Sequence, residues 1–256
     1  MKRVGIIGCG WLGFSLAEEF LSQGFEVRGT TTSLAKTAIL SEKRIAPFIF
    51  QLGEVLPDSF FDALDYLIIC FPISSKHSTE KYADFCSQLN SKVVTSTQLI
   101  FTSSTSVYSQ DQDLTDERNG KIDPDSINYY LEHRLTHYFP NKLTILRLGG
   151  LINETRHPIV HLAGRKEISN GNAPVNLVHR NDVIRMIMKC IELNIEGELL
   201  NCVYPFHPSK AAYYTLKAKE FQLEPPTFTS DENSMHKVVS SQKAMDMLLF
   251  DFIYPI

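Results

Sequence analysis

The chain has 256 residues, 43% of them hydrophobic and 21% charged, which suits one large domain or one domain with a small appendage. With a formal net charge of −4 and no basic stripe, it offers no surface for nucleic acid or an anionic membrane. Its five cysteines lack the paired spacing of a zinc site, and we find neither a signal peptide nor an apolar run of about 18 residues. We therefore expect a cytoplasmic monomer or homodimer without a metal site, acting on a small-molecule substrate.

The first motif lies at the start of the chain, where an apolar, β-branched run from residue 4 to 7 meets three glycines. Gly8 allows a sharp exit from a strand, Gly10 lets the backbone approach a pyrophosphate, and Gly13 lets the next helix lie close to the sheet. The pattern predicts a dinucleotide-binding fingerprint, with an ordinary structural turn as the alternative. The residues expected to contact the cofactor are Gly8, Cys9, Gly10, Trp11, Leu12 and Gly13.

The end of the second predicted strand, residues 25–30, indicates which dinucleotide binds. Proteins that use NAD place an acidic residue near this point, and none occurs from Arg28 through Ala38. Hydroxyls and positive charge suit a 2′-phosphate instead, although the same hydroxyls also suit a simple helix cap. We expect NADP, with NAD as the alternative, held by Thr30, Thr31, Thr32, Ser33 and Lys36 and less surely by Arg28.

Strand-like and helix-like segments then alternate, with strands at 47–52, 65–72 and 98–102 and a helix at 78–89. This alternation is typical of an α/β protein with a Rossmann-type, doubly wound parallel sheet. Ligands bind at the carboxyl edge of such sheets. We therefore expect Phe71, Pro72 and Thr102, which stand at strand ends, to line the cofactor site.

Three segments resemble the extended and atypical short-chain dehydrogenases/reductases, and the resemblance is closest to the NAD-dependent epimerase/dehydratase-like branch. The segments are residues 101–108 (FTSSTSVY), residues 146–152 followed by Arg156-His157-Pro158, and residues 175–183 (VNLVHRNDV). The resemblance implies a sixth strand at 146–152 and a helix from Val183 to Leu193, introduced by Asp182. It divides the chain into a dinucleotide-binding core, residues 1–150, and a smaller substrate-side region, residues 151–256, packed on the core.

The resemblance also assigns catalytic roles. Ser104 matches the family's serine, which orients the substrate oxygen, whereas the family's Tyr-x-x-x-Lys pair has no match. In the helix expected at 126–135, Tyr129 is followed by His133 and Tyr130 by Arg134, which is too basic to relay protons. The candidate acids are Tyr130, otherwise a partly buried helix aromatic, and Tyr108, otherwise a pocket wall.

Three further side chains are candidates for substrate contact. Arg156 and His157 precede a proline in a loop expected to cover the pocket, where Arg156 would meet an anionic group or form a surface ion pair. His179 is a candidate base or a structural histidine. Downstream we expect a strand at 199–203, a helix at 209–221, a linker at 223–233 and an apolar terminal segment at 245–256.

Two functions follow from these residues. The first is an NAD(P)-binding oxidoreductase or epimerase/dehydratase-like enzyme for a small polar, sugar-nucleotide-like substrate. The alternative is a non-catalytic dinucleotide-binding sensor or regulatory protein that has lost the Tyr-x-x-x-Lys pair. Because one scaffold hosts both, fold alone does not separate them.

Overall fold

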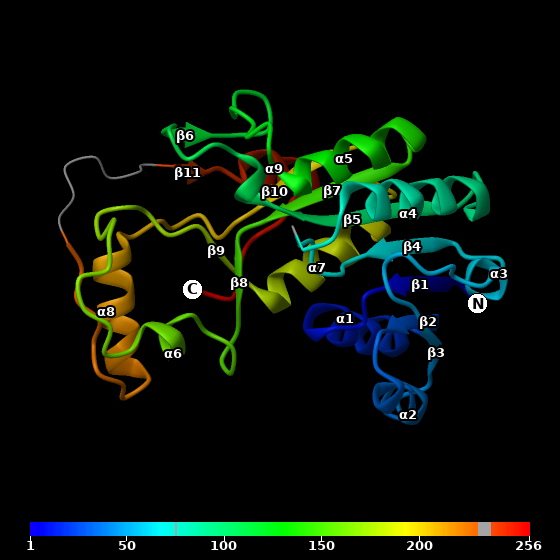
Figure 1. Cartoon of the computed structure of the whole chain (residues 1–256), viewed down its shortest axis with the longest axis horizontal. Coiled ribbons are helices and arrows are strands. Elements are labelled where there is room, and N and C mark those ends of the chain that lie inside the picture. The colour runs from blue at the N-terminus through cyan, green and yellow to red at the C-terminus, as the bar shows by residue number, and fades with distance from the viewer. Residues whose placement is uncertain (75, 230–236) are drawn as a thin grey trace. The chain divides into compact units, whose positions relative to one another are not determined.

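A seven-stranded parallel sheet forms the centre of the computed structural model, which describes residues 1–74, 76–229 and 237–256. The strand order is β10-β7-β5-β4-β1-β2-β3 (Figure 1). Strand β1 (Arg3–Ile7) pairs in parallel with β2 (Glu26–Thr31) on one side and β4 (Tyr66–Ile69) on the other. The order of the strands reverses there, which is the doubly wound arrangement that the sequence predicts, and the predicted fold class is confirmed.

Strands and helices alternate along most of the chain. The other strands of the large sheet are β3 (Ile45–Ile49), β5 (Gln98–Ser104), β7 (Leu143–Leu148) and β10 (Leu199–Cys202). The helices are α1 (Trp11–Ser22), α2 (Leu34–Glu42), α3 (Asp58–Phe61), α4 (Thr79–Lys92), α5 (Ile127–Tyr138), α6 (Ile159–Leu162), α7 (Arg180–Glu192), α8 (Lys210–Glu220) and α9 (Gln242–Leu248). Within the described residues, no helix is both long and apolar enough to cross a membrane.

Serine caps explain where two of these helices begin. The Ser126 hydroxyl accepts a hydrogen bond from the Tyr129 amide at 3.4 Å, and the Ser209 hydroxyl accepts one from the Ala212 amide at 3.2 Å. Each bond satisfies one of the amides that the first turn of a helix leaves unpaired. The sequence therefore fixes the starts of α5 and α8 locally.

The chain divides into two compact units, each made of several segments. The first comprises residues 1–103, 124–146 and 187–199, and the second comprises residues 104–123, 147–186 and 200–256. The predicted division near residue 150 concerns the roles of the two regions in binding, and it stays a prediction.

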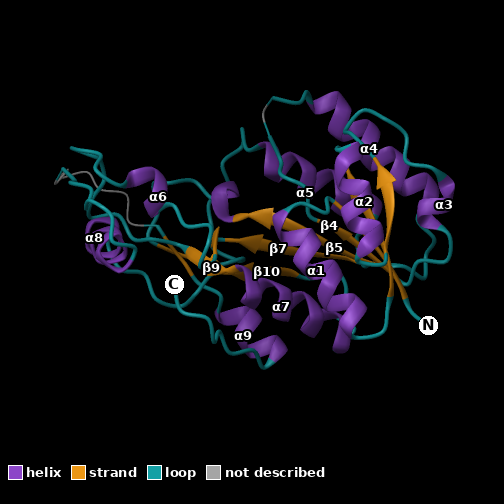
Figure 2. Ribbon diagram, turned by 90° about the horizontal axis from the view of Figure 1, so that it is seen from below, coloured by secondary structure: helices purple, strands orange, loops and turns teal. Residues whose placement is uncertain are grey.

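The core of the first unit lies between the sheet and two helices. Apolar side chains of β1, β4 and β5 pack against α4 and α5, with Phe85 and Leu131 among the buried residues. Helix α1 covers the opposite face of the sheet, and Leu16 and Phe20 are fully buried there (Figure 2). Because both faces are covered, the middle residues of the central strands β1, β4 and β5 are largely apolar.

The second unit has its own apolar cluster and two small parallel ribbons. Tyr213 and Tyr214 of α8 pack with Ile152 and Ile159 in this cluster. One ribbon pairs β8 (Gly150–Ile152) with β9 (Leu177–His179), and the other pairs β6 (Leu114–Thr115) with β11 (Val238–Val239).

The sixth strand, predicted at 146–152, is wrong in its bounds. It is two strands, because the Gly149 amide donates to the Cys202 carbonyl whereas the next amide, that of Gly150, donates to the Asn176 carbonyl. A Cβ at Gly149 would lie 2.8 Å from the Asn176 carbonyl oxygen, so glycine permits this close approach.

The expectation that Asp182 caps the helix after it is wrong. Helix α7 begins at Arg180, so Asp182 does not cap it. The buried carboxylate of Asp182 instead accepts hydrogen bonds from the Tyr254 amide at 3.0 Å and from Arg185 at 2.6 Å.

Part of the linker predicted at 223–233, residues 230–233, lies outside the described residues.

Candidate functional site

The glycine turn between β1 and α1 has the geometry that its residue types require. Gly8 has φ +106°, a conformation that glycine adopts readily, and the Gly10 amide donates to the Gly8 carbonyl at 2.7 Å. A Cβ on Gly13 would collide with the Gly8 carbonyl oxygen and lie 2.9 Å from Cys70 Sγ. A Cβ on Gly10 would meet nothing within 4 Å, so space is open above the start of the helix.

Thr30, at the end of β2, holds this turn in place. Its hydroxyl accepts a hydrogen bond from the Gly8 amide at 2.9 Å, and its carbonyl accepts one from the Cys9 amide at 2.8 Å. The side chain is 2% exposed. Thr30 therefore shapes the turn, a role that the sequence did not indicate.

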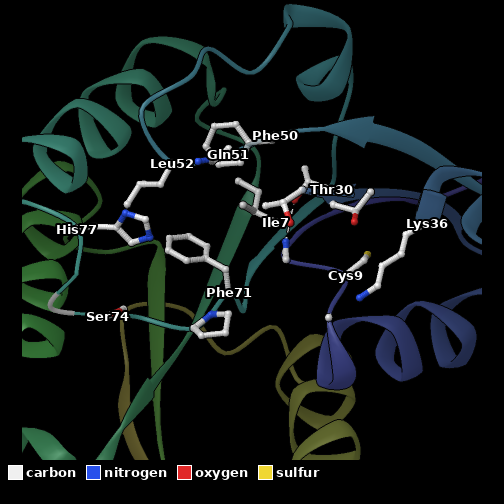
Figure 3. Close-up of a pocket in the computed structure, with 15 residues that line it drawn as sticks. Ile7, Cys9, Thr30, Lys36, Phe50, Gln51, Leu52, Phe71, Ser74 and His77 are labelled. Atoms are coloured by element: carbon white, nitrogen blue, oxygen red, sulfur yellow. Dashed lines mark hydrogen bonds between the residues drawn. The ribbon is translucent and has the colours of Figure 1, made fainter. Parts of the chain in front are cut away.

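A cavity of about 370 Å³ opens beside the turn at the carboxyl edge of the sheet (Figure 3). It lies wholly within the first unit. The predicted cofactor residues that line it are Gly8, Cys9, Gly10, Thr30, Thr31, Thr32, Lys36, Phe71 and Pro72. Trp11, Leu12, Gly13, Ser33 and Thr102 are not among its lining residues.

One end of the cavity is polar and cationic. Lys36, in the first turn of α2, extends its ammonium toward the glycine turn (Figure 3). The Thr31 hydroxyl accepts from the Ser33 amide at 3.2 Å. Arg28 does not reach this end, because its guanidinium donates to the carbonyls of Phe60 and Asp62 at 3.0 and 2.8 Å. Lys36 is thus the cationic side chain lining the cavity within the described residues.

The other end is largely apolar, and of its residues sequence reasoning predicted Phe71 but missed Phe50, Leu52 and His77. Phe50 and Leu52 follow β3, and Phe71 and His77 follow β4; their side chains gather around this end (Figure 3). The Phe71 ring also packs edge-on against Phe85 of α4, with centroids 5.3 Å apart. The signal available in the sequence for Phe50 and Leu52 was their position in the last part of the strand predicted at 47–52.

The cysteines near the turn are not reactive nucleophiles. Burial raises the pKa of the Cys9 thiol to about 12, and burial raises that of Cys70 as well. The thiolate is the nucleophilic form of cysteine, so both side chains stay as inert thiols at neutral pH.

The predicted catalytic serine is the last residue of β5, just before a short 3-10 turn. The Ser104 hydroxyl accepts a hydrogen bond from the Ser106 amide at 3.1 Å, which caps the turn Thr105–Val107. Just before it, the Thr102 hydroxyl donates to the Ile69 carbonyl at 3.3 Å. The buried Ser103 hydroxyl has no hydrogen-bond partner in the described part of the chain.

The two tyrosine candidates have different surroundings. Tyr108 is 1% exposed, its hydroxyl donates to Asn201 Oδ1 at 2.9 Å, and the guanidinium of Arg147 lies 4.7 Å from its ring centre. Burial raises the pKa of Tyr108. Tyr130 on α5 is half-buried and packs against the core of the first unit. These contacts give both residues structural roles, and proton transfer by either stays a prediction.

The three predicted substrate residues lie in the second unit. Arg156 is exposed, and its amide donates to Asn153 Oδ1 at 2.7 Å. His157 is buried between the Ile159 amide and the Tyr213 hydroxyl, and burial lowers its pKa to about 4. His179 is 5% exposed and stacks on Tyr254 with centroids 4.9 Å apart.

The second nitrogen of His179, Nε2, lies 3.3 Å from Glu154, and its Nδ1 accepts from the Asn181 amide. Both nitrogens are therefore engaged, as expected of a structural histidine. Among the residues that the structure describes, no cluster of histidine, cysteine or acidic side chains is suited to hold a metal ion.

Comparison with known proteins gives relatives along the whole chain. Protein YeeZ of Escherichia coli K12 is 31% identical over 268 aligned positions, which cover 100% of this chain and 97% of YeeZ. No protein-family model matches the sequence.

Solved structures with the same fold have much lower sequence identity. MoeE5, solved with UDP-glucose and NAD, has a TM-score of 0.81 at 14% identity and is matched over 99% of this chain and 94% of its own. UDP-glucuronic acid 4-epimerase from Bacillus cereus, solved with NAD, has a TM-score of 0.79 at 15% identity over 99% and 92%. The chain thus belongs to the same family as protein YeeZ, and its fold is that of the NAD-dependent epimerase/dehydratase-like short-chain dehydrogenases/reductases.

Proposed function

We propose that this protein binds a nicotinamide dinucleotide, NADP in preference to NAD, in the cavity beside the glycine turn. The observation that carries the proposal is the combination at Gly8, Gly10 and Gly13 of a positive φ, open space and a tight helix contact. Each satisfies a separate requirement of pyrophosphate binding at a helix start.

The cavity residues divide between the parts of such a ligand. The amides at the start of α1 face the position for the pyrophosphate, where the helix dipole favours negative charge. The hydroxyls of Thr31 and Thr32 and the ammonium of Lys36 suit a 2′-phosphate. The apolar end near Phe50 and Phe71 suits a flat base, which gains from aromatic and aliphatic contact.

For the reaction, we infer an oxidoreductase or epimerase/dehydratase-like activity on a small polar substrate. MoeE5, which shares this fold, is solved with NAD and either UDP-glucose or UDP-glucuronic acid, which supports a sugar-nucleotide-like substrate. A bound nicotinamide would supply the hydride chemistry. The chain's own contribution is Ser104. Its hydroxyl oxygen accepts a hydrogen bond from the Ser106 amide, so the hydroxyl proton is left to donate to a substrate oxygen.

A non-catalytic dinucleotide sensor is the second candidate, and a specific observation favours it. The Tyr108 hydroxyl already donates to Asn201, and α5 carries arginine four residues after Tyr130 where the family has lysine. Turnover separates the two functions. A stoichiometric change in NADPH absorbance with carbonyl or sugar-nucleotide substrates supports the enzyme, and binding without turnover supports the sensor.

The binding proposal is tested with the single tryptophan, Trp11, which lies inside the glycine motif. We expect NADPH to quench Trp11 fluorescence by energy transfer to the reduced nicotinamide and to bind more tightly than NADH. NADP and NAD, titrated in parallel, separate the effect of the phosphate from that of oxidation state. A flat titration of folded protein with all four dinucleotides at millimolar concentration would overturn the proposal.

A further inference from the structure

Lys237 is a buried lysine whose ammonium contacts the backbone of a turn that is distant in sequence. It is 8% exposed, and its Nζ donates to the Tyr108 carbonyl at 2.9 Å and lies 3.4 Å from the Thr105 carbonyl oxygen. Both carbonyls belong to the turn that follows Ser104. All of these residues lie in the second unit.

The backbone around Lys237 is held independently of its ammonium. The Asn176 side chain donates to the Lys237 carbonyl at 2.7 Å and accepts from the Val239 amide at 2.8 Å. Strand β11 pairs with β6, and the Ser240 carbonyl accepts from Asn201 Nδ2 at 2.9 Å. Removing the ammonium alone therefore leaves the strand anchored on both sides of Val238.

Several hydrogen bonds hold the turn that the ammonium contacts, and the Val107 carbonyl in its middle accepts one from the Asp123 amide at 2.8 Å. The Thr105 carbonyl accepts from the Tyr108 amide at 3.3 Å, and the Ser106 amide donates to the Ser104 hydroxyl at 3.1 Å. The bonds that the Tyr108 and Ser106 amides donate are longer than the usual N–H···O hydrogen bond, which measures about 2.9 to 3.0 Å between nitrogen and oxygen. The shorter bond from Lys237 closes the far end of the turn, where carbonyl oxygens concentrate negative charge.

Burying an ammonium in this place has a cost that a packing role does not require. Removing a charge from water costs several kcal/mol, and an apolar side chain of similar length would fill the same space. Burial lowers the pKa of Lys237, partly offset by the negative charge of Asp123. Besides the charge of Asp123, two carbonyls of one turn compensate for the cost, so the hydrogen bonds to that turn are the specific feature of this lysine.

We propose that Lys237 is a positioning residue for Ser104, fixing the turn that orients the serine hydroxyl. The inference rests on the proposed function for the role of Ser104 toward substrate, while the clamp itself concerns only the second unit. It also implies that the segment 237–241, near the end of the chain, controls the geometry of a site residue more than 130 positions earlier.

Backbone hydrogen exchange of the full-length protein tests the clamp. In Lys237→Met, we expect the Ser106 and Tyr108 amides to exchange about tenfold faster than in the wild type, because the turn opens locally. The Val239 amide, held by Asn176, and the amides of β1 should change by less than about twofold. Lys237→Arg keeps the charge and the donors, so it should restore at least part of the protection.

A purely structural role gives a different pattern, since lost global stability accelerates all the slowest amides together. Uniform acceleration, or unchanged exchange at Ser106 and Tyr108, would overturn the proposal. If Lys237→Met does not fold, the same exchange rates are compared in Lys237→Gln, whose neutral side-chain amide takes the place of the ammonium as hydrogen-bond donor. NADPH titration of Trp11 should be unchanged in every variant; loss of binding in the wild type would refute the proposed function without altering the exchange result.

Discussion

Gly10 and Gly13, three residues apart in the glycine motif, should respond oppositely to substitution in stability and in cofactor binding. At Gly13, an alanine Cβ would collide with the Gly8 carbonyl oxygen and press on Cys70 Sγ at 2.9 Å. Because the obstacle is backbone, α1 must shift, and we expect a loss of about 2 to 3 kcal/mol in the free energy of unfolding. At Gly10, φ is −80° and nothing lies within 4 Å of a Cβ, so Gly10→Val should cost no more than about 1 kcal/mol.

Binding should follow the reverse order. Gly10→Val places a branched side chain in the open space assigned to the pyrophosphate, so the Trp11 response to NADPH should vanish in a folded protein. Urea unfolding gives the stability of each variant, and fluorescence titration gives the affinity. The reasoning fails if Gly10→Val binds NADPH like the wild type, or if Gly13→Ala is as stable as the wild type.

The remaining predictions concern charge, pH and backbone strain. Lys36→Ala should weaken NADPH binding by about 1 to 3 kcal/mol and barely change NADH binding; equal losses in fluorescence titrations would make Lys36 merely structural. His157, with a folded pKa of about 4 below the unfolded value of 6.5, stabilises the fold above pH 6.5, and about 3 kcal/mol should be lost as pH falls toward 4. Urea unfolding should show no such component in His157→Gln. Leu249, 87% exposed at φ +48°, ends α9 in a left-handed conformation, so Leu249→Gly should raise stability by about 0.5 to 1 kcal/mol, and a lower melting temperature would contradict this.

The glycine turn was predictable because its geometry is encoded locally. Three glycines, an apolar strand and a helical repeat occur within 20 residues, and each has a separate physical reason. The same holds for the serine caps of α5 and α8. Prediction worked where the partners of a residue are its neighbours in sequence.

Partners distant in sequence explain what prediction missed. Arg28 was a candidate for binding a phosphate, but its guanidinium donates hydrogen bonds to the carbonyls of residues 60 and 62. Asp182 looked like a helix cap, yet its carboxylate accepts amides about 70 positions later, at Ile253 and Tyr254. Lys237 gave no signal at all, since a lone lysine in a polar stretch is usually exposed.

Most of the apolar end of the cavity, Phe71 excepted, was missed for a related reason. Its side chains come from loops after two different strands, and only the strand order of the sheet brings Phe50 and Phe71 together. Periodicity identifies strands, but it does not order them in a sheet. The division of 146–152 into two strands was not predictable from the sequence either. The apolar pattern of a segment is the same whether it pairs with one neighbouring strand or changes from one neighbour to another.

The two bonds of Thr30 have a consequence for protein engineering. In dinucleotide-binding sheets the residues near the end of the second strand select between NAD and NADP, and here that strand end also fastens the glycine turn through the Gly8 and Cys9 amides. Residues 31, 32 and 36 line the cavity without these turn-holding bonds. A redesign toward NAD should therefore place its new carboxylate at Thr31 or Thr32 and leave Thr30 untouched, because a change at Thr30 would disturb binding of both dinucleotides equally.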